Sequence, residues 1–200
     1  MVQQRARYLQ HVMTLMKCKN DHDEMLNEYV DQITNIQSEG PYVLFGYSGG
    51  GNLAFEVAKT MEQRGMQVSD IIMLDTTPWN KEVQEIASTI LAEAANLAHL
   101  DALEWTATPY AQNKRTKFLM YMENLTNSGL VEANIHNIVV DTVTRLLKKK
   151  WINTTSKAYI EYNGIGTHDE LLNPEYIQEN VEIIKQILNK IKDKAFEEMV

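Results

Sequence analysis

The sequence is poor in cysteine and in positive charge. Cys18 is the only cysteine in 200 residues, which excludes a disulfide framework and a zinc site built from several thiolates. Asp and Glu outnumber Lys and Arg by 27 to 19, and the net charge is −8. The single basic run, Lys148 to Lys150, is typical of a solvated helix end. Because a nucleic-acid-binding face needs clustered excess Lys and Arg, no nucleic-acid partner is expected.

Long hydrophobic runs are also lacking. Near the start of the sequence, polar residues such as Gln10 and Thr14 interrupt the apolar ones, so residues 1–17 form neither a secretory signal nor a membrane span. Hydrophobic residues make up 44% of the chain and charged residues 23%, a composition typical of globular proteins. A length of 200 residues suits one domain with its own core. We therefore expect a single cytoplasmic domain without a membrane partner.

Helical and strand patterns alternate along the sequence, which predicts an α/β fold with a mostly parallel sheet and helices on both of its faces. Apolar residues at helical spacing predict helices over residues 1–17, 24–36, 52–63, 146–157 and 176–196. Short apolar runs rich in β-branched and aromatic residues predict strands over residues 42–45, 71–74, 135–140 and 158–162.

The stretch after the second predicted strand departs from this alternation. Two helical patterns, near residues 83–100 and 110–128, follow one another without a strand between them. A helical insertion of this kind either packs on the core or covers an active site as a lid. We expect a helical lid at about residues 80–133, within one domain that spans residues 1–200.

The most specific signal is the G-x-S-x-G sequence from Gly46 to Gly50. It lies between the predicted strand 42–45 and a helical pattern, which is the strand–turn–helix context of a nucleophile elbow. Such a turn presents the Ser48 hydroxyl above the sheet. Gly46 and Gly50, two residues before and after the serine, are expected to avoid colliding Cβ atoms. The backbone N–H of Gly49 then points to where an oxyanion would form.

A serine nucleophile needs a base, and the base needs an orienting acid. His168 is the best placed of the five histidines, because it lies in a glycine-rich loop after the last predicted strand. This loop and the elbow belong to the same edge of a parallel sheet. Asp75 and Asp141 each follow a predicted strand, and both keep the chain order Ser, Asp, His. The spacing does not separate these two carboxylates.

Four segments resemble the C-terminal, type I thioesterase domains of nonribosomal peptide synthetases, notably those of Bacillus lipopeptide assembly lines. They are residues 40–58, 71–75, 121–129 and 164–172. The resemblance implies an α/β-hydrolase fold with a helical lid, and it favours Asp75 as the acid, with Asp141 as the alternative. Ser48 would be the nucleophile, His168 the base and Gly49 an oxyanion donor.

The resemblance also implies a substrate and a partner. A carrier protein would present a peptidyl or acyl chain as a phosphopantetheine thioester, and the serine would take over that chain as an ester. Water, or a hydroxyl or amine of the peptide, would then release an acid or a macrocycle. Neither a metal nor a soluble cofactor is implied, and the sequence has no H-E-x-x-H or Walker lysine.

The N-terminal part departs from this family. Members have further strands, and a loop that supplies a second oxyanion donor, ahead of the point where this sequence begins to match. Residues 1–22 show neither feature, so we expect a shortened domain that lacks the first strands and begins with a charged helical segment. Alternative functions are a general serine esterase, an editing thioesterase, or a non-catalytic remnant that binds carrier protein or acyl chains.

Overall fold

The computed structural model describes residues 21–86, 125–140 and 145–197. They divide between two compact units: residues 21–32, 79–86 and 125–126 belong to one, and residues 33–78, 127–140 and 145–197 belong to the other. The helix predicted over residues 1–17 and most of the predicted lid lie outside the described residues. In the described ranges, no helix is long and apolar enough to span a membrane.

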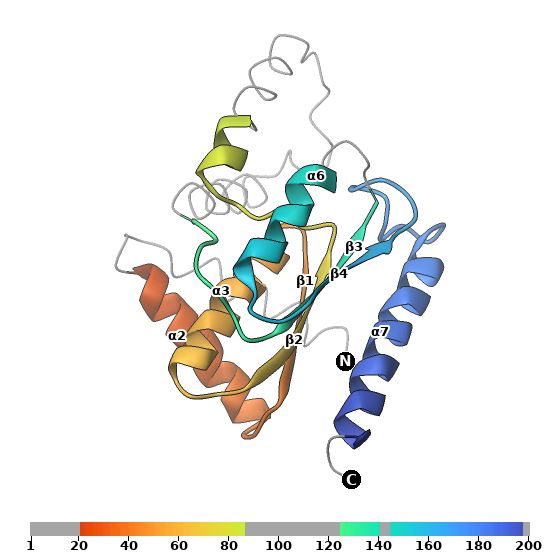
Figure 1. Cartoon of the computed structure of the whole chain (residues 1–200). Coiled ribbons are helices and arrows are strands. Elements are labelled where there is room, and N and C mark those ends of the chain that lie inside the picture. Colours follow the sequence, from red (N-terminus) through yellow and green to blue (C-terminus); the bar gives the residue numbers. More distant parts are fainter. Residues whose placement is uncertain (1–20, 87–124, 141–144, 198–200) are drawn as a thin grey trace, which may run out of the picture. The chain divides into compact units, whose positions relative to one another are not determined.

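A four-stranded sheet forms the centre of the second unit (Figure 1). Strands β1 (Tyr42–Tyr47), β2 (Val68–Leu74), β3 (Asn134–Val139) and β4 (Tyr159–Asn163) lie side by side in chain order, and all three pairs are parallel. The predicted α/β fold with a parallel sheet is therefore confirmed. Because parallel strands end at the same edge, the segments after β1, β2 and β4 meet there.

Helices α3 (Gly49–Gln63) and α7 (Ile177–Glu197) cover opposite faces of this sheet (Figure 1). The inward side of α3 buries Phe55, Ala58 and Met61. On the other face, the core that α7 covers is built from Ile72, Leu74, Ile138, Leu171 and Ile187.

Strand β2 is buried on both faces. Ile72 and Leu74 belong to the core on the α7 side, and because side chains alternate along a strand, Ile71 and Met73 point to the α3 side. All four are at most 1% exposed. A strand enclosed in this way is a rigid support for the residues that follow it.

The predicted helices that lie within the described ranges have shifted ends. Helix α2 runs over Asp21–Ile36, three residues earlier than predicted. The helix predicted over residues 146–157 is shorter: α6 covers Arg145–Lys148, and the 3₁₀ helix η2 covers Lys149–Thr154. Thr155 then turns extended, with its hydroxyl donating to the Ala133 carbonyl at 2.6 Å. This side-chain bond competes with a further helical turn.

The predicted helix over residues 110–128 extends too far. Residues 125–128 are not helical, and the remainder lies outside the described residues. Asn127 is buried, and its side-chain amide donates to the Asn52 carbonyl at 3.2 Å and to Glu56 Oε1 at 2.8 Å. The Asn52 amide donates in turn to Asn127 Oδ1 at 2.6 Å. These side-chain contacts hold the non-helical segment against α3.

Candidate active site

Ser48 lies in the tight turn between β1 and α3. Its φ of 52° and ψ of −127° fall in a region that side chains avoid. The turn is fixed on both sides, because the Ser48 N–H donates to the Leu74 carbonyl and the Gly51 N–H donates to the Ser48 carbonyl, both at 2.9 Å. The strained strand–turn–helix that the motif predicted is therefore present.

Glycine is required at two positions around this turn, but only one of them was predicted. A Cβ at Gly46 would lie 2.2 Å from the Gly50 carbonyl oxygen, and a Cβ at Gly51 would lie 2.2 Å from Thr76 Oγ1. At Gly50 the added carbon would meet nothing within 4 Å. The prediction that Gly50 avoids a collision is wrong, because this residue belongs to the exposed side of the first turn of α3.

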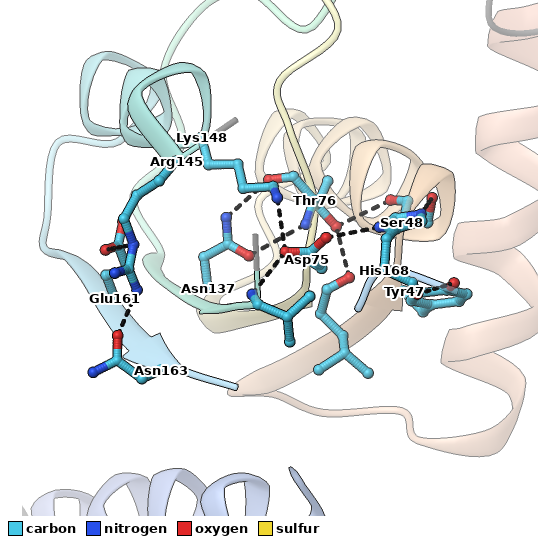
Figure 2. Close-up of polar contacts among 12 residues, drawn as sticks. Tyr47, Ser48, Asp75, Thr76, Asn137, Arg145, Lys148, Glu161, Asn163 and His168 are labelled. Carbon is cyan, nitrogen blue, oxygen red and sulfur yellow. Dashed lines mark hydrogen bonds and ion pairs between the residues drawn. The ribbon is translucent and has the colours of Figure 1, made fainter. Parts of the chain in front are cut away.

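Ser48, His168 and Asp75 form a continuous hydrogen-bonded chain (Figure 2). Ser48 Oγ lies 3.0 Å from His168 Nε2, and His168 Nδ1 lies 2.7 Å from Asp75 Oδ2. If Nδ1 carries the proton, it donates to the carboxylate and leaves Nε2 to accept from the serine hydroxyl. The three residues follow β1, β4 and β2, respectively. The alternative acid, Asp141, lies outside the described residues.

Asp75 is held more tightly than its place in the sequence suggests. Its side chain is fully buried, and Oδ1 accepts from Lys148 Nζ at 2.8 Å and from the Val140 N–H at 3.0 Å. Burial raises the pKa of the Asp75 carboxyl, but the hydrogen bonds from His168, Lys148 and Val140 and the Lys148 charge outweigh it and lower the pKa to about 2. Asp75 is therefore an ionised carboxylate at neutral pH.

Tyr47 supports the loop that carries His168. Its hydroxyl donates to the His168 carbonyl at 2.8 Å, and the two ring centroids are 5.4 Å apart. Burial, followed by the charges of Asp169 and Asp75, raises the pKa of the Tyr47 hydroxyl, so it keeps its proton and remains a donor. The His168 side chain itself is 40% exposed, which leaves its ring accessible to a substrate.

Thr76 links the segment that follows β2 to the turn that holds Ser48. Its hydroxyl donates to the Ser48 carbonyl at 3.0 Å. Its own carbonyl accepts from the Asn137 side-chain amide at 2.8 Å and from Trp151 Nε1 at 3.0 Å. The segment after β2 is thus tied to β3 and to the elbow (Figure 2), and through Trp151 to η2.

The first residue of α3, Gly49, offers its N–H beside the nucleophile. The N–H groups of a first helical turn have no partner within the helix, and the helix dipole favours negative charge there. Gly49 is therefore placed to bind an oxyanion on a group attached to Ser48. In the part of the chain that the structure describes, no three His, Cys, Asp or Glu side chains are grouped to hold a metal ion.

Sequence reasoning missed Lys148, Tyr47 and Thr76. The lysine belongs to the run from 148 to 150, which we expected to be solvated, and for this residue the expectation is wrong because it is only 2% exposed. Thr76 follows the acid directly, so its position in the sequence was a usable signal. No pattern in the sequence marks Tyr47 as a support of the His168 loop.

Comparisons with known proteins agree with the fold. The family described as "Thioesterase domain" matches residues 1–150. One subunit of the mycosubtilin synthase of Bacillus subtilis is 37% identical over 183 residues, which cover 88% of this chain and 7% of that protein. Surfactin synthase subunit 3 of Bacillus subtilis (strain 168) is 32% identical, over 84% of this chain and 14% of that protein. The chain thus spans only a small part of these relatives.

Solved structures of thioesterase domains have a similar fold. The thioesterase domain SrfTE, which cyclizes the lipopeptide antibiotic surfactin, is 31% identical, with a TM-score of 0.65 over 83% of this chain and 74% of that one. The NocB thioesterase domain from the nocardicin cluster has a TM-score of 0.64 over 84% of this chain and 73% of that one, at 21% identity, and supports the fold alone. These neighbours confirm the predicted α/β-hydrolase fold. Since the family match covers three quarters of the sequence, the chain belongs to the thioesterase domain family.

Proposed function

We propose that this chain is a serine thioesterase that releases a peptidyl chain from the phosphopantetheine thioester of a carrier protein. The observation that carries the proposal is the hydrogen-bonded chain from Asp75 through His168 to Ser48, built on a strained elbow. The similarity to SrfTE, which cyclizes the lipopeptide antibiotic surfactin, supports the choice of a peptidyl substrate.

In the first half-reaction, Ser48 Oγ attacks the thioester carbonyl while His168 Nε2 takes the hydroxyl proton. The negative charge that develops on the carbonyl oxygen is stabilised by the Gly49 N–H. When the intermediate collapses, the carbon–sulfur bond breaks and His168 returns the proton to the departing thiol. The products are an acyl-serine ester and the free phosphopantetheine thiol of the carrier protein.

In the second half-reaction, a nucleophile attacks the acyl-serine ester. His168 takes a proton from water, or from a hydroxyl or amine of the peptide, and gives it to the departing Ser48 oxygen. Water yields a free acid, and an internal group yields a macrocycle. The phosphopantetheine that delivers the chain is the only prosthetic group in this scheme, and it belongs to the carrier protein.

Asp75 orients the imidazole and stabilises its cation in both steps. Its lowered pKa keeps the carboxylate charged across the pH range in which a histidine base works. Asp75→Asn would favour the wrong tautomer of His168, and in a well-studied triad such a change lowers kcat about 10⁴-fold. Asp141→Asn is the matched comparison for the choice of acid.

Two measurements test the proposal. A fluorophosphonate probe should label the wild type but not Ser48→Ala, and absence of any labelling would favour a non-catalytic remnant. The active enzyme is then given a peptidyl thioester and the corresponding simple ester, with the acid or macrocycle measured by mass spectrometry. Preference for the simple ester would favour a general esterase. Greater damage from Asp141→Asn than from Asp75→Asn would refute the assignment of the acid.

A further inference from the structure

Lys148 is a buried cation in contact with the acid of the proposed triad. Its Nζ lies 2.8 Å from Asp75 Oδ1, and the two side chains are 3% and 0% exposed. The next residue in the run, Lys149, is exposed. A lysine ammonium is costly to remove from water, so its burial here requires the Asp75 carboxylate as a partner.

The contacts divide the two oxygens of this carboxylate between different partners. Oδ1 accepts from Lys148 and from the Val140 N–H, and Oδ2 accepts from His168 alone among the described contacts. Figure 2 shows Lys148 and His168 approaching Asp75 from different sides. With Oδ1 occupied by two donors, the carboxylate cannot rotate freely, and Oδ2 stays directed at the imidazole.

The Lys148 charge also changes the electrostatic field at the His168 ring. An isolated carboxylate stabilises an imidazolium, which removes the neutral base as the pH falls. A buried cation on the far oxygen offsets part of that negative charge, and its field is poorly screened because both groups of the pair are buried.

The other charged groups around the site are less able to act in this way. His168 faces Ser48, Asp75 and the Tyr47 ring, and the acidic residues that follow it, Asp169 and Glu170, are more open to solvent than the buried pair. On α6, Arg145 is held at 2.8 Å by Glu161. Lys148 is therefore the cation placed to tune the Asp75–His168 pair in the described part of the chain.

We propose that Lys148 is a positioning residue of the triad, which fixes Asp75 through Oδ1 and offsets the charge of the carboxylate that orients His168. This inference rests on the proposed function, in which His168 is the general base. Removing the Lys148 charge is expected to move the acidic limb of the pH profile of kcat/KM to higher pH.

The test compares Lys148→Met, which removes charge and donors, with Lys148→Gln, which removes the charge and keeps a donor. Lys149→Met is the matched control, because it removes the same charge from an exposed neighbour. The readouts are the midpoint of the His168 ring titration by NMR and the pH dependence of kcat/KM. We expect both Lys148 variants to move the midpoint and the acidic limb of the profile to higher pH, with activity recovering at alkaline pH. Lys149→Met should leave both unchanged.

Other results overturn the inference. A midpoint like that of the wild type, or an equal loss of activity at every pH, would make Lys148 a structural residue only. The same conclusion follows if circular dichroism shows that neither Lys148 variant folds. Failure of the wild type to react with a fluorophosphonate would refute the proposed function instead, and the NMR midpoint would still decide the effect of Lys148 on His168.

Discussion

A Cβ at Gly46 should disable the elbow, whereas one at Gly50 should not. The Cβ of Gly46→Ala would lie 2.2 Å from the Gly50 carbonyl oxygen, 2.3 Å from its carbon and 2.4 Å from the Gly51 nitrogen. All three are backbone atoms, and Cβ contacts below 3.0 Å essentially do not occur. Strand β1 and the first turn of α3 must therefore separate by roughly 1 Å, which is comparable to the shifts that overpacking forces on a protein core.

Both elements that must separate hold Ser48, so the proposed nucleophile moves with them. A misplacement of about 1 Å can cost about 10²-fold in rate, and overpacking typically costs about 1–3 kcal/mol of stability. We expect Gly46→Ala to react about 10²-fold more slowly than the wild type and to be less stable by about 1–3 kcal/mol. Gly50→Ala places its methyl in open space, and alanine in a helix is favoured over glycine by about 0.5–1 kcal/mol. It should keep the wild-type rate and unfold at an equal or higher urea concentration.

The assay is the second-order rate of fluorophosphonate labelling, combined with urea unfolding followed by circular dichroism. Labelling isolates the elbow from substrate binding, and the unfolding curve shows whether a slow variant is folded. Equal damage from the two alanines would refute the steric argument. So would a Gly46→Ala variant that reacts like the wild type.

Three further predictions concern the same unit. Because the folded-state pKa of Asp75 is lowered from 3.8 to about 2, the unfolded chain binds this proton first as the pH falls. About 2 kcal/mol of stability, complete above pH 4, should then be lost between about pH 4 and pH 2; urea unfolding across this range should show that slope, and Asp75→Asn should flatten it. Ser48→Gly should be more stable than Ser48→Ala by about 1 kcal/mol in the same assay, because glycine tolerates the positive φ; equal stability would mean that the turn is not strained. Asn127→Ala should lower the melting temperature and cost about 1–3 kcal/mol, because it removes the donor to buried Glu56; a smaller cost would show that water replaces the amide.

Periodicity was sufficient to predict the sheet and the two main helices that cover it. Strand β2 is an apolar run because it is buried on both faces. Helix α7 has an apolar stripe because only one of its sides packs against the sheet. The elbow was predictable because one short motif encodes the strand, the turn and the helix together. Since parallel strands end at one edge of the sheet, the sequence alone was sufficient to assign His168 to the same edge as Ser48.

Features that depend on three-dimensional contacts could not be predicted. Three consecutive lysines look alike in sequence, yet only contact with Asp75 distinguishes Lys148. Gly50 and Gly51 are equally plausible turn residues, and the position of Thr76 decides between them. The helical pattern that ends near Ser128 gave no sign that Asn127 would bind α3 through its side chain instead.

The contacts of Thr76 have a consequence for the local dynamics of this protein. Thr76 bonds to the turn that holds Ser48 and accepts from both Asn137 and Trp151. Neither this turn nor the segment after β2 can therefore open without breaking a hydrogen bond to the other. Backbone amides near positions 48 and 75 should therefore exchange with deuterium at a common rate, through a single opening event. Warming should abolish the proposed acyl transfer in one step rather than gradually, because the segments that hold Ser48 and Asp75 open together.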